Sequence, residues 1–281
     1  MESEVEKAVN TEVYQDIAQV YVEIIGSEDA NTYYERPVMF RMMPDLAGMQ
    51  VLDAGCGPGV YSEWLLNHGA EVTGVDYSEA TIKLAEERTK GRGAFHVADL
   101  SEPVSLLSDS EFDMVVCPLV LDYIRDWIPT LQEFNRILKD QGRLLFSCGH
   151  PCSSRESGNL ENYFAIRKVE ETWGAGLSKR FSMPRFHRPL SSVFSSLTRS
   201  GFEVNRVVEP EPTQYLKETD AELHSRLLRQ PLSLCVLATK TGCPRSRMVR
   251  VVPYDARWQQ QFEEIRNVLS KQHCPTIGCT G

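Results

Sequence analysis

The sequence lacks the features expected of a membrane-spanning, secreted or nucleic-acid-binding protein. No apolar run approaches the roughly 20 residues that a membrane-spanning helix needs. The acidic amino terminus, Met1 to Glu4, is followed by no apolar segment, so no secretory signal is expected. Basic residues are also scarce: 30 Lys and Arg face 39 Asp and Glu, and the net charge of −9 disfavours binding to phosphate backbones. We expect a cytoplasmic protein with no nucleic-acid partner and no membrane insertion.

Cysteine is present, but not in the spacing of a metal or redox site. None of the eight cysteines forms a Cys-x-x-Cys pair, and no histidine pattern suggests zinc. His150 and Cys152 are two positions apart but lack further ligands. Four cysteines lie in or beside apolar runs, where reduced cysteine behaves as a small core residue: Cys56, Cys117, Cys148 and Cys235. We expect reduced thiols and no metal.

Short apolar runs alternate with helical patterns from about residue 49 to 240, which is typical of an α/β protein with a largely parallel sheet. Seven runs predict strands, at 49–54, 71–75, 94–98, 112–117, 143–148, 202–208 and 232–239. Helices are predicted at 58–67, 78–90, 126–139 and from 190 to Gly201. Ser78 is expected to cap its helix, Gly142 to follow a helix end in the left-handed conformation, and Thr219 with Glu222 to form a capping box.

Residues 151–189 interrupt this alternation. The segment holds Ser, Gly and aromatic residues but few periodic stretches, and loops of this length are usually functional lids or disordered. Its aromatic residues favour an apolar lid, or alternatively a satellite core beneath a long loop: Tyr163, Phe164, Trp173, Phe181 and Phe186. We predict substrate contacts from Tyr163 and Trp173, and from Tyr14 near the amino terminus.

The segment 51–59, Val-Leu-Asp-Ala-Gly-Cys-Gly-Pro-Gly, carries the strongest signal. Glycines between a buried strand and a helix let the backbone approach a ligand where any Cβ would collide. Dinucleotide folds prefer Gly-x-Gly-x-x-Gly or a final Ala, but position 60 is Val and the glycine falls at 59. A tight turn with no ligand stays open as an alternative for the loop taken alone.

Acidic residues also end the next two predicted strands. Asp76 stands where a carboxylate can accept hydrogen bonds from both ribose hydroxyls of a nucleoside. Asp99 stands where a carboxylate can accept from an adenine amine, while the backbone N–H of Leu100 serves a ring nitrogen. Either aspartate could instead be a helix N-cap or lie in a solvated turn. Three consecutive strand ends nevertheless meet in one crevice, where open α/β sheets bind ligands.

These segments, with Phe112-Asp113-Met114-Val115-Val116-Cys117, resemble the class I S-adenosylmethionine-dependent methyltransferases, especially the small-molecule group that includes ubiquinone and menaquinone methyltransferases. The resemblance covers about residues 11–240 and implies an α/β fold, namely a seven-stranded, mostly parallel sheet with helices on both faces and an antiparallel last strand. It implies S-adenosylmethionine as cofactor and a small-molecule acceptor. The cofactor-binding residues it implies are Tyr34, Arg36, Asp53, Ala54, Gly55, Cys56, Gly57, Asp76, Tyr77, Asp99, Leu100, Cys117 and Leu119.

Within this resemblance, Asp53 and 55–57 approach the methionine part, and Cys117 and Leu119 line the methyl-donor side. The segment Asn31-Thr32-Tyr33-Tyr34-Glu35-Arg36-Pro37 is also similar to this group, whose N-terminal helices close over cofactor and substrate. Tyr34 or Arg36 could reach the methionine carboxylate, since an arginine fork suits a carboxylate. A surface helix with a packed tyrosine explains the segment equally well.

Methyl transfer from a sulfonium needs an aligned nucleophile, exclusion of water and sometimes removal of a proton. Correct orientation of the two reactants can by itself lower the activation barrier by roughly 7–11 kcal/mol. The candidate bases are Asp122, His150 and His187. Asp122 stands where many relatives have His, and capping the following turn is its favoured alternative role. Either histidine could instead be packed or solvated.

Residues 241–281 do not fit a methyltransferase domain assigned to 1–240. The segment from Val249 to Trp258 and the later run Ile277-Gly278-Cys279-Thr280-Gly281 resemble the opening of the GrpB-like family, which has a nucleotidyltransferase-type fold. These residues are too few to complete such a domain, and we assign them no activity. The predicted function is methyl transfer to a small, partly apolar acceptor, with homodimer formation left open. The alternatives are a non-catalytic S-adenosylmethionine-binding regulatory protein and a dinucleotide oxidoreductase, which Val60 disfavours.

Overall fold

The computed structural model describes residues 30–153, 162–173 and 181–241. The chain divides into two units, 1–247 and 248–281, and every described residue belongs to the first. Of the tail predicted at 241–281, only residue 241 is among the described residues. Tyr14, a predicted substrate contact, also lies outside them. No helix of the described ranges is long and apolar enough to cross a membrane.

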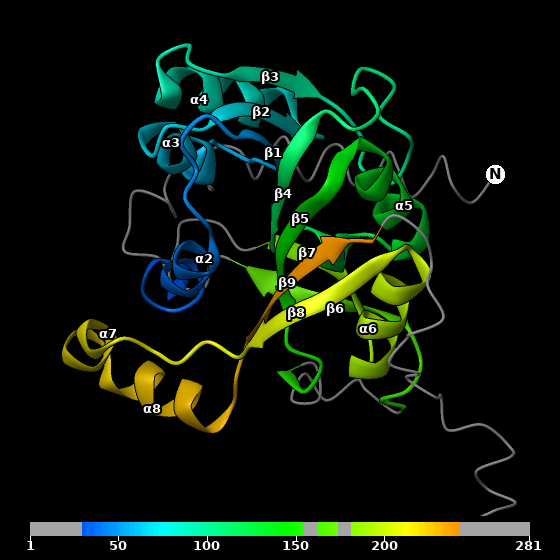
Figure 1. The fold of residues 1–281 in the computed structure, drawn as a ribbon. Helices are drawn as coiled ribbons and strands as arrows, with labels where there is room; N and C mark the ends of the chain where they lie inside the picture. The colour runs from blue at the N-terminus through cyan, green and yellow to red at the C-terminus, as the bar shows by residue number, and fades with distance from the viewer. Residues whose placement is uncertain (1–29, 154–161, 174–180, 242–281) are drawn as a thin grey trace, which may run out of the picture. The chain divides into compact units, whose positions relative to one another are not determined.

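The seven predicted strands form one sheet in the order β3-β2-β1-β4-β5-β9-β8 (Figure 1). Strands β1 to β5 pair in parallel, and β9 runs antiparallel to both β5 and β8. The strands are β1 (Gln50–Ala54), β2 (Glu71–Asp76), β3 (Ala94–Val97), β4 (Phe112–Pro118), β5 (Leu138–Gly149), β8 (Phe202–Val208) and β9 (Ser233–Lys240). The predicted sheet, including its antiparallel last strand, is confirmed.

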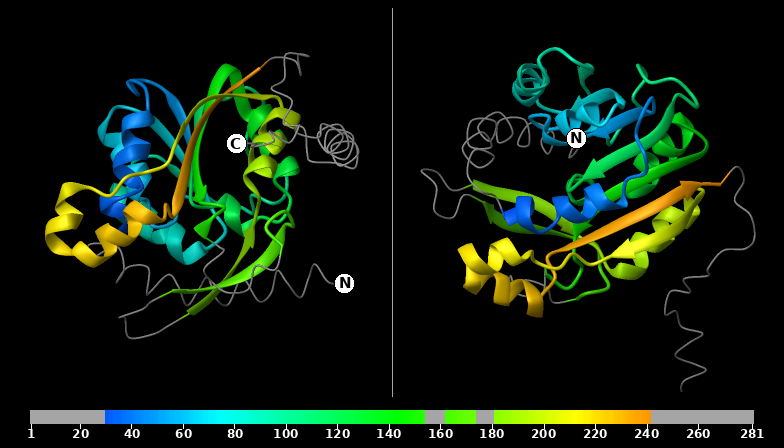
Figure 2. Two further views of the ribbon diagram at one scale, coloured as in Figure 1. Left: turned by 90° about the horizontal axis from the view of Figure 1, so that it is seen from below. Right: turned by 60° about the vertical axis from the view of Figure 1, so that its left-hand side comes forward.

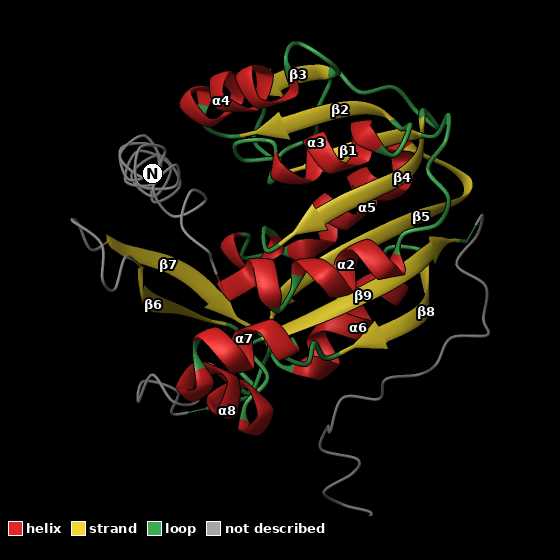
Figure 3. Cartoon of the chain, turned by 90° about the vertical axis from the view of Figure 1, so that its left-hand side faces the viewer, coloured by secondary structure: helices red, strands yellow, loops and turns green. Residues whose placement is uncertain are grey.

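Helices cover both faces of this sheet (Figure 3). The elements are η1 (Ala30–Tyr33), α2 (Arg36–Met42), α3 (Val60–Asn67), α4 (Glu79–Thr89), η2 (Leu121–Tyr123), α5 (Trp127–Ile137), α6 (Leu190–Arg199), α7 (Gln214–Thr219) and α8 (Ala221–Arg229). Because side chains alternate along a strand, Val51 packs with α2 and α3 while its neighbour Leu52 packs with α5 and α6. Each buried strand therefore contributes to two cores, which explains its nearly continuous apolar sequence.

The long insertion contains a second sheet that the sequence did not predict. Strand β6 (Arg167–Trp173) pairs antiparallel with β7 (Phe181–His187), beside the main sheet (Figure 2). Pro184 lies within β7, opposite Glu170, and a proline argues against a central strand. In a two-stranded sheet each strand has an open edge, so a residue without an N–H is tolerated there.

Two helix termini, at Gly142 and at Thr219, differ from the predictions. Gly142 lies within β5, and Gln141 takes the left-handed conformation, with φ of 62°. The prediction for Gly142 was wrong because β5 begins directly after α5, and the irregular register between β4 and β5 absorbs the turn. The capping box was also wrong: Thr219 ends α7, and Asp220 caps α8 by accepting a hydrogen bond from the Leu223 N–H at 2.9 Å. Ser78 caps α4 as predicted.

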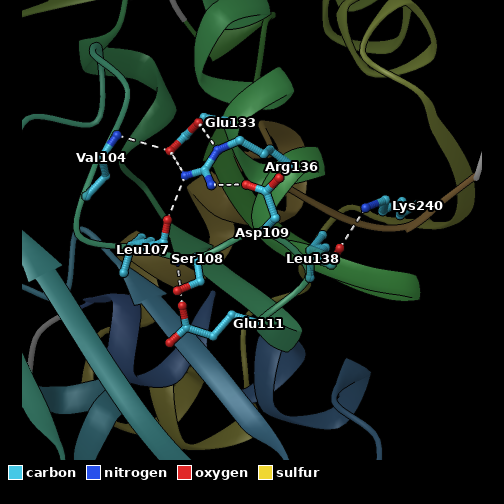
Figure 4. A network of polar contacts seen from close by, with 9 residues as sticks. All are labelled: Val104, Leu107, Ser108, Asp109, Glu111, Glu133, Arg136, Leu138 and Lys240. Atoms are coloured by element: carbon cyan, nitrogen blue, oxygen red, sulfur yellow. Dashed lines mark hydrogen bonds and ion pairs between the residues drawn. The ribbon is translucent and has the colours of Figure 1, made fainter.

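The N-terminal edge of the parallel strands is braced by an arginine network (Figure 4). Arg136 of α5 donates to both carboxylate oxygens of Glu133, at 2.9 and 2.6 Å, and to the carbonyl of Leu107. Glu133 also accepts from the Val104 N–H at 3.0 Å. At the same edge Lys240 donates to the carbonyl of Leu138. These contacts fix the edge opposite the strand ends that carry the predicted site.

Candidate functional site

The glycine loop has a backbone that only glycine adopts comfortably. Gly55, Gly57 and Gly59 have φ of 75°, 51° and 79°. A Cβ on Gly55 would lie 2.3 Å from Cγ2 of Val120, and one on Gly59 would lie 2.9 Å from the Cα of Ala85 in α4. The loop is therefore held between the turn after β4 and helix α4, with backbone exposed where side chains would otherwise stand.

Asp53 is fully buried at the end of β1 and offers an unused acceptor. Its Oδ2 accepts from the Ser62 hydroxyl at 2.6 Å, whereas Oδ1 has no hydrogen-bond partner among the described residues. Burial raises the pKa of Asp53 to about 7; Ser62 opposes the shift and Asp76 adds to it. A buried acceptor without a donor costs free energy, so a cationic donor such as the ammonium of the methionine part fits this position.

Asp76 ends β2 and ties the glycine loop to the next helix. Its Oδ1 accepts from the Ser78 N–H at 3.0 Å and the Thr81 hydroxyl at 2.8 Å, and its Oδ2 accepts from the Gly57 N–H at 2.9 Å. Burial raises the pKa of this partly exposed carboxyl. The side chain thus lies between the loop and α4, where ribose hydroxyls could donate to it.

Asp99 follows β3 by two positions. Its Oδ1 accepts from both the N–H and the hydroxyl of Ser101, at 2.9 and 2.6 Å, and within the described chain no donor reaches its Oδ2. Leu100 is buried, and its carbonyl accepts from the Thr130 hydroxyl of α5. Since β3, β2 and β1 are parallel neighbours, Asp99, Asp76 and Asp53 come to one edge of the sheet. Tyr77, partly exposed, directly follows Asp76.

The two N-terminal candidates have other partners in the structure. The hydroxyl of Tyr34 accepts from the Leu232 N–H at 2.9 Å, just before β9, and its ring packs with Leu216 and Leu227. Arg36 donates to the Thr32 hydroxyl at 2.6 Å. Tyr34 therefore has a structural role in anchoring β9, and the assignment of either residue to the methionine carboxylate stays a prediction.

Between these two residues lies Glu35, which the sequence did not single out. It is buried, and its carboxylate accepts from the Tyr61 hydroxyl of α3 at 2.8 Å and from the Ser147 hydroxyl of β5 at 2.5 Å. Ser147 in turn accepts from the N–H of Leu119, a non-glycine residue with φ of 56°. A hydrogen-bonded chain thus connects the start of α2 to the strained turn after β4.

The end of β4 separates the cofactor side from a second group of polar residues. Cys117 is fully buried, and burial raises the pKa of its thiol. The charges of Asp53 and Asp122 act in the same direction. Leu119 is partly buried two positions later. The predicted methyl-donor side therefore adjoins Asp122.

Two of the three candidate bases are engaged. Nδ1 of His150 accepts from the Cys152 N–H at 3.2 Å, and Nε2 lies 2.8 Å from a carboxylate oxygen of Glu209. Asp122 accepts from the Gly149 N–H at 2.5 Å. The expectation that Asp122 caps the next turn was wrong, because Asp126 caps α5 and Asp122 instead joins η2 to the end of β5.

His187, the last residue of β7, keeps one ring nitrogen available. Its Nε2 lies 2.7 Å from the carbonyl oxygen of Tyr163, and since a carbonyl only accepts, this nitrogen carries the proton. Nδ1 is buried with no partner among the described residues. Burial lowers the pKa of His187; the Tyr163 carbonyl opposes this, and Arg185 and Arg188 add to it. The neutral ring therefore presents a basic Nδ1.

His187 lines a small cavity of about 10 Å³, large enough for one water. Its other lining residues come from η2, β5, β7, α5 and α6 and from the segments directly after β5 and β7: Asp122, Trp127, Cys148, Gly149, Pro151, Arg185, Phe186, Arg188 and Val193. Of the predicted substrate contacts, the Tyr163 ring lies 5.4 Å from that of His187. Trp173 ends β6, but its side chain lies outside the described residues. No group of three metal-ligating side chains occurs in the described ranges.

Several proteins similar to this chain are methyltransferases. A family model described as "Methyltransferase domain" matches residues 52–146. A protein of Haemophilus influenzae is 26% identical over 203 residues, covering 64% of this chain and 77% of its own. The ubiquinone biosynthesis O-methyltransferase of Pseudomonas syringae is 32% identical over 105 residues, covering 37% of this chain and 45% of its own. The chain thus spans under half the length of that named relative.

Solved structures extend the similarity over a larger part of the chain. An S-adenosylmethionine dependent methyltransferase from Mesorhizobium loti superposes with a TM-score of 0.59 at 26% identity, covering 73% of this chain and 97% of that one. The chain therefore contains a methyltransferase domain with the fold of the S-adenosylmethionine-dependent methyltransferases, and S-adenosylmethionine is its cofactor. The glycine loop, the unpartnered Oδ1 of Asp53 and the carboxylate of Asp76 fit that cofactor.

Proposed function

We propose that the protein transfers a methyl group from S-adenosylmethionine to a small, partly apolar acceptor, with His187 as the general base. One observation carries the proposal: the buried, unpartnered Nδ1 of His187 lines a cavity that also contains Asp122, beside the end of β4. A proton acceptor thus stands next to the predicted methyl-donor side. The named relatives do not favour the alternative of a non-catalytic binding protein.

S-adenosylmethionine supplies the reactive methyl group, and the chain has to place a nucleophile in line with it. Asp53 and the glycine loop would hold the methionine part, and Asp76 and Asp99 the nucleoside. Trp127, Phe186 and Val193 line the cavity and would exclude water from the acceptor side. Alignment and exclusion of water supply most of the rate enhancement in such a reaction.

Within this proposal His187 takes the proton of the acceptor onto Nδ1. The Tyr163 carbonyl fixes the tautomer and the ring orientation, because it holds the proton of Nε2. The lowered pKa of His187 keeps the ring neutral near pH 7. His150 is the weaker candidate, since both of its ring nitrogens already have partners.

The proposal is tested by transfer of labelled methyl to a panel of small phenols, amines and thiols, with RNA and unfolded protein as competing acceptors. We expect turnover of at least one small acceptor. His187→Gln should lower kcat about 10²- to 10⁴-fold without changing affinity for S-adenosylhomocysteine, which is typical of losing a general base. His150→Gln is the matched control and should change kcat little. Preferred methylation of RNA or protein, or equal losses in both variants, contradicts the proposal.

We also propose that the protein works in the cytoplasm on a small molecule. Five described cysteines are free thiols, and four of these are buried. The net charge of −9 opposes a nucleic-acid partner. Whether two copies associate stays a prediction, which sedimentation of the full chain would decide.

A further inference from the structure

Glu35 is a buried carboxylate, 1% exposed, whose two oxygens bind two different elements of the main sheet layer. Its Oε2 accepts from the Tyr61 hydroxyl of α3, and its Oε1 accepts from the Ser147 hydroxyl of β5. Its own backbone is fixed by α2, because its carbonyl accepts from the Val38 and Met39 N–H groups, both at 3.1 Å. Replacing a whole buried polar network by apolar side chains is often neutral or stabilising, so stability alone does not explain this one. A satisfied network does fix one geometry.

The first contact of Glu35 leads to Asp53. Tyr61 is buried in the first turn of α3, and the next residue, Ser62, donates to Oδ2 of Asp53 at 2.6 Å. Holding the Tyr61 hydroxyl fixes the rotation of this turn about the helix axis, and thereby the position of the Ser62 hydroxyl. Oδ1 of Asp53 is buried without a partner among the described residues, so Ser62 orients the carboxylate from the Oδ2 side.

The second contact of this carboxylate leads to the glycine loop from another direction. The Ser147 hydroxyl accepts from the Leu119 N–H at 3.1 Å, where the backbone is left-handed. The next residue, Val120, packs over Gly55 so closely that a Cβ there would lie 2.3 Å from its Cγ2. Both contacts therefore end at the segment 53–55, at the end of β1.

We propose that Glu35 and Tyr61 are positioning residues for the methionine part of S-adenosylmethionine. They act through the Ser62 hydroxyl on the carboxylate of Asp53. The inference rests on one part of the proposed function, namely that Asp53 receives the ammonium of the methionine part. A carboxylate that already points in the right direction needs no reordering when the ligand binds, and this raises affinity. A supporting side chain displaced by about 1 Å is enough to weaken such a contact.

The nucleoside part should not depend on this network, because its predicted carboxylate is supported by a different helix. Asp76 accepts from the Ser78 N–H at 3.0 Å and from the Thr81 hydroxyl at 2.8 Å, both at the start of α4. Tyr61 belongs to α3. Loss of the Tyr61 hydroxyl should therefore affect one end of the cofactor and spare the other.

Calorimetry on the full chain with two ligands tests this difference. S-adenosylhomocysteine carries the amino-acid part, and 5′-methylthioadenosine lacks it. Asp53→Asn should weaken binding of S-adenosylhomocysteine about 10-fold or more and change that of methylthioadenosine less than about twofold. Tyr61→Phe, which removes only a hydroxyl, should weaken S-adenosylhomocysteine about 3- to 10-fold and also spare methylthioadenosine. The same selective loss is expected of Glu35→Gln.

The matched control is Thr198→Val, which removes a hydroxyl that donates to the Phe194 carbonyl of its own helix, α6, on the opposite face of the sheet. It should change neither affinity. Since Tyr61 acts through Asp53, adding Tyr61→Phe to Asp53→Asn should weaken S-adenosylhomocysteine by less than about twofold more. Additive losses in this double variant overturn the inference.

Equal losses for the two ligands in Tyr61→Phe and Glu35→Gln also overturn it, because the pair would then support only the fold. The selectivity of Asp53→Asn separates this failure from a failure of the proposed ammonium contact. If Asp53→Asn affects both ligands alike, that contact is wrong and this inference falls with it. If Asp53→Asn is selective while Tyr61→Phe and Glu35→Gln are not, only this inference is wrong.

Discussion

The carboxylate of Glu35 accepts a hydrogen bond from the hydroxyl of Tyr61 across the buried junction of α2 and α3, with 2.8 Å between the oxygens. The same carboxylate accepts from Ser147 of β5, whose hydroxyl holds the turn after β4. Burial and the Glu35 charge both raise the pKa of Tyr61, which therefore stays a donor. One side chain thus couples the N-terminal segment to the strand ends that form the site.

Removing this carboxylate should destabilise the fold more than neutralising it. Glu35→Ala leaves two hydroxyls buried without their acceptor, and we expect a loss of about 3–5 kcal/mol in the free energy of unfolding. Glu35→Gln keeps one oxygen acceptor and should lose about 1–2 kcal/mol. Urea denaturation measures both, with the exposed Glu87→Ala as control. A loss in Glu35→Ala no larger than in Glu87→Ala would show that the network contributes nothing.

The sequence predicts the residues of the cofactor side from local signals. Asp53 and Asp76 end apolar runs, and parallel strands bring such ends to one edge of the sheet whatever the rest of the chain does. Glu35 escaped prediction because its partners are 26 and 112 positions away. Nothing near it in sequence distinguishes it from a solvated helix residue.

The β6–β7 pair was not predicted, for a related reason. The β6–β7 pair has little apolar alternation and contains Pro184, so its sequence suggests a loop. His187 was a candidate base, but His150 was equally plausible from sequence. Only the tertiary partners of the two rings, Glu209 for one and the Tyr163 carbonyl for the other, separate them.

Asp53 should make the stability of the protein depend on pH. Its pKa in the fold is about 7, against 3.8 for the ordinary side chain. An acid whose pKa is raised by folding stabilises the fold below its unfolded pKa, and that contribution is lost as pH rises through 7. At about 1.4 kcal/mol per pH unit, the loss between pH 4 and 8 is on the order of 4 kcal/mol.

Denaturation of the cofactor-free protein over this pH range measures the effect, with Asp53→Asn and the exposed Asp140→Asn compared with the unchanged chain. The Asp53→Asn protein should have the flatter profile, while Asp140→Asn should follow the parent. If both variants keep the parent's slope, another group causes the dependence.

The same group should link cofactor binding to proton release. An ammonium near Oδ1 favours the ionised carboxylate, so binding below pH 7 must expel the proton of Asp53. The affinity for S-adenosylhomocysteine should therefore rise up to about tenfold per pH unit below 7 and level off above it. Calorimetry in buffers of different ionisation enthalpy counts the protons released, approaching one near pH 6. Asp53→Asn should abolish both the slope and the release, and a slope that persists there contradicts the contact.

Gly55 should tolerate no side chain, because of its left-handed backbone and because of a clash with Val120. Gly48 separates these two reasons. Gly48 and Gly55 have nearly the same φ, 74° and 75°, but a Cβ on Gly48 meets nothing within 4 Å. Gly48→Ala should therefore cost only the left-handed strain, about 1 kcal/mol. Gly55→Ala adds a clash with Val120 and should cost about 1–3 kcal/mol more, with weakened binding of S-adenosylhomocysteine.

The clash itself is tested by a double-mutant cycle with Val120→Ala, which removes both methyl groups in question. If the clash with Val120 causes the destabilisation by Gly55→Ala, the double variant should be about 0.5–3 kcal/mol more stable than the sum of the two single effects predicts. The same Val120→Ala change combined with Gly48→Ala should be additive, because no contact connects those positions. Additivity in both pairs would mean that the turn after β4 does not confine the loop. The shape of the cofactor site would then be determined by the backbone of the glycine loop itself. The strained turn that Glu35 and Ser147 hold in place would not determine it.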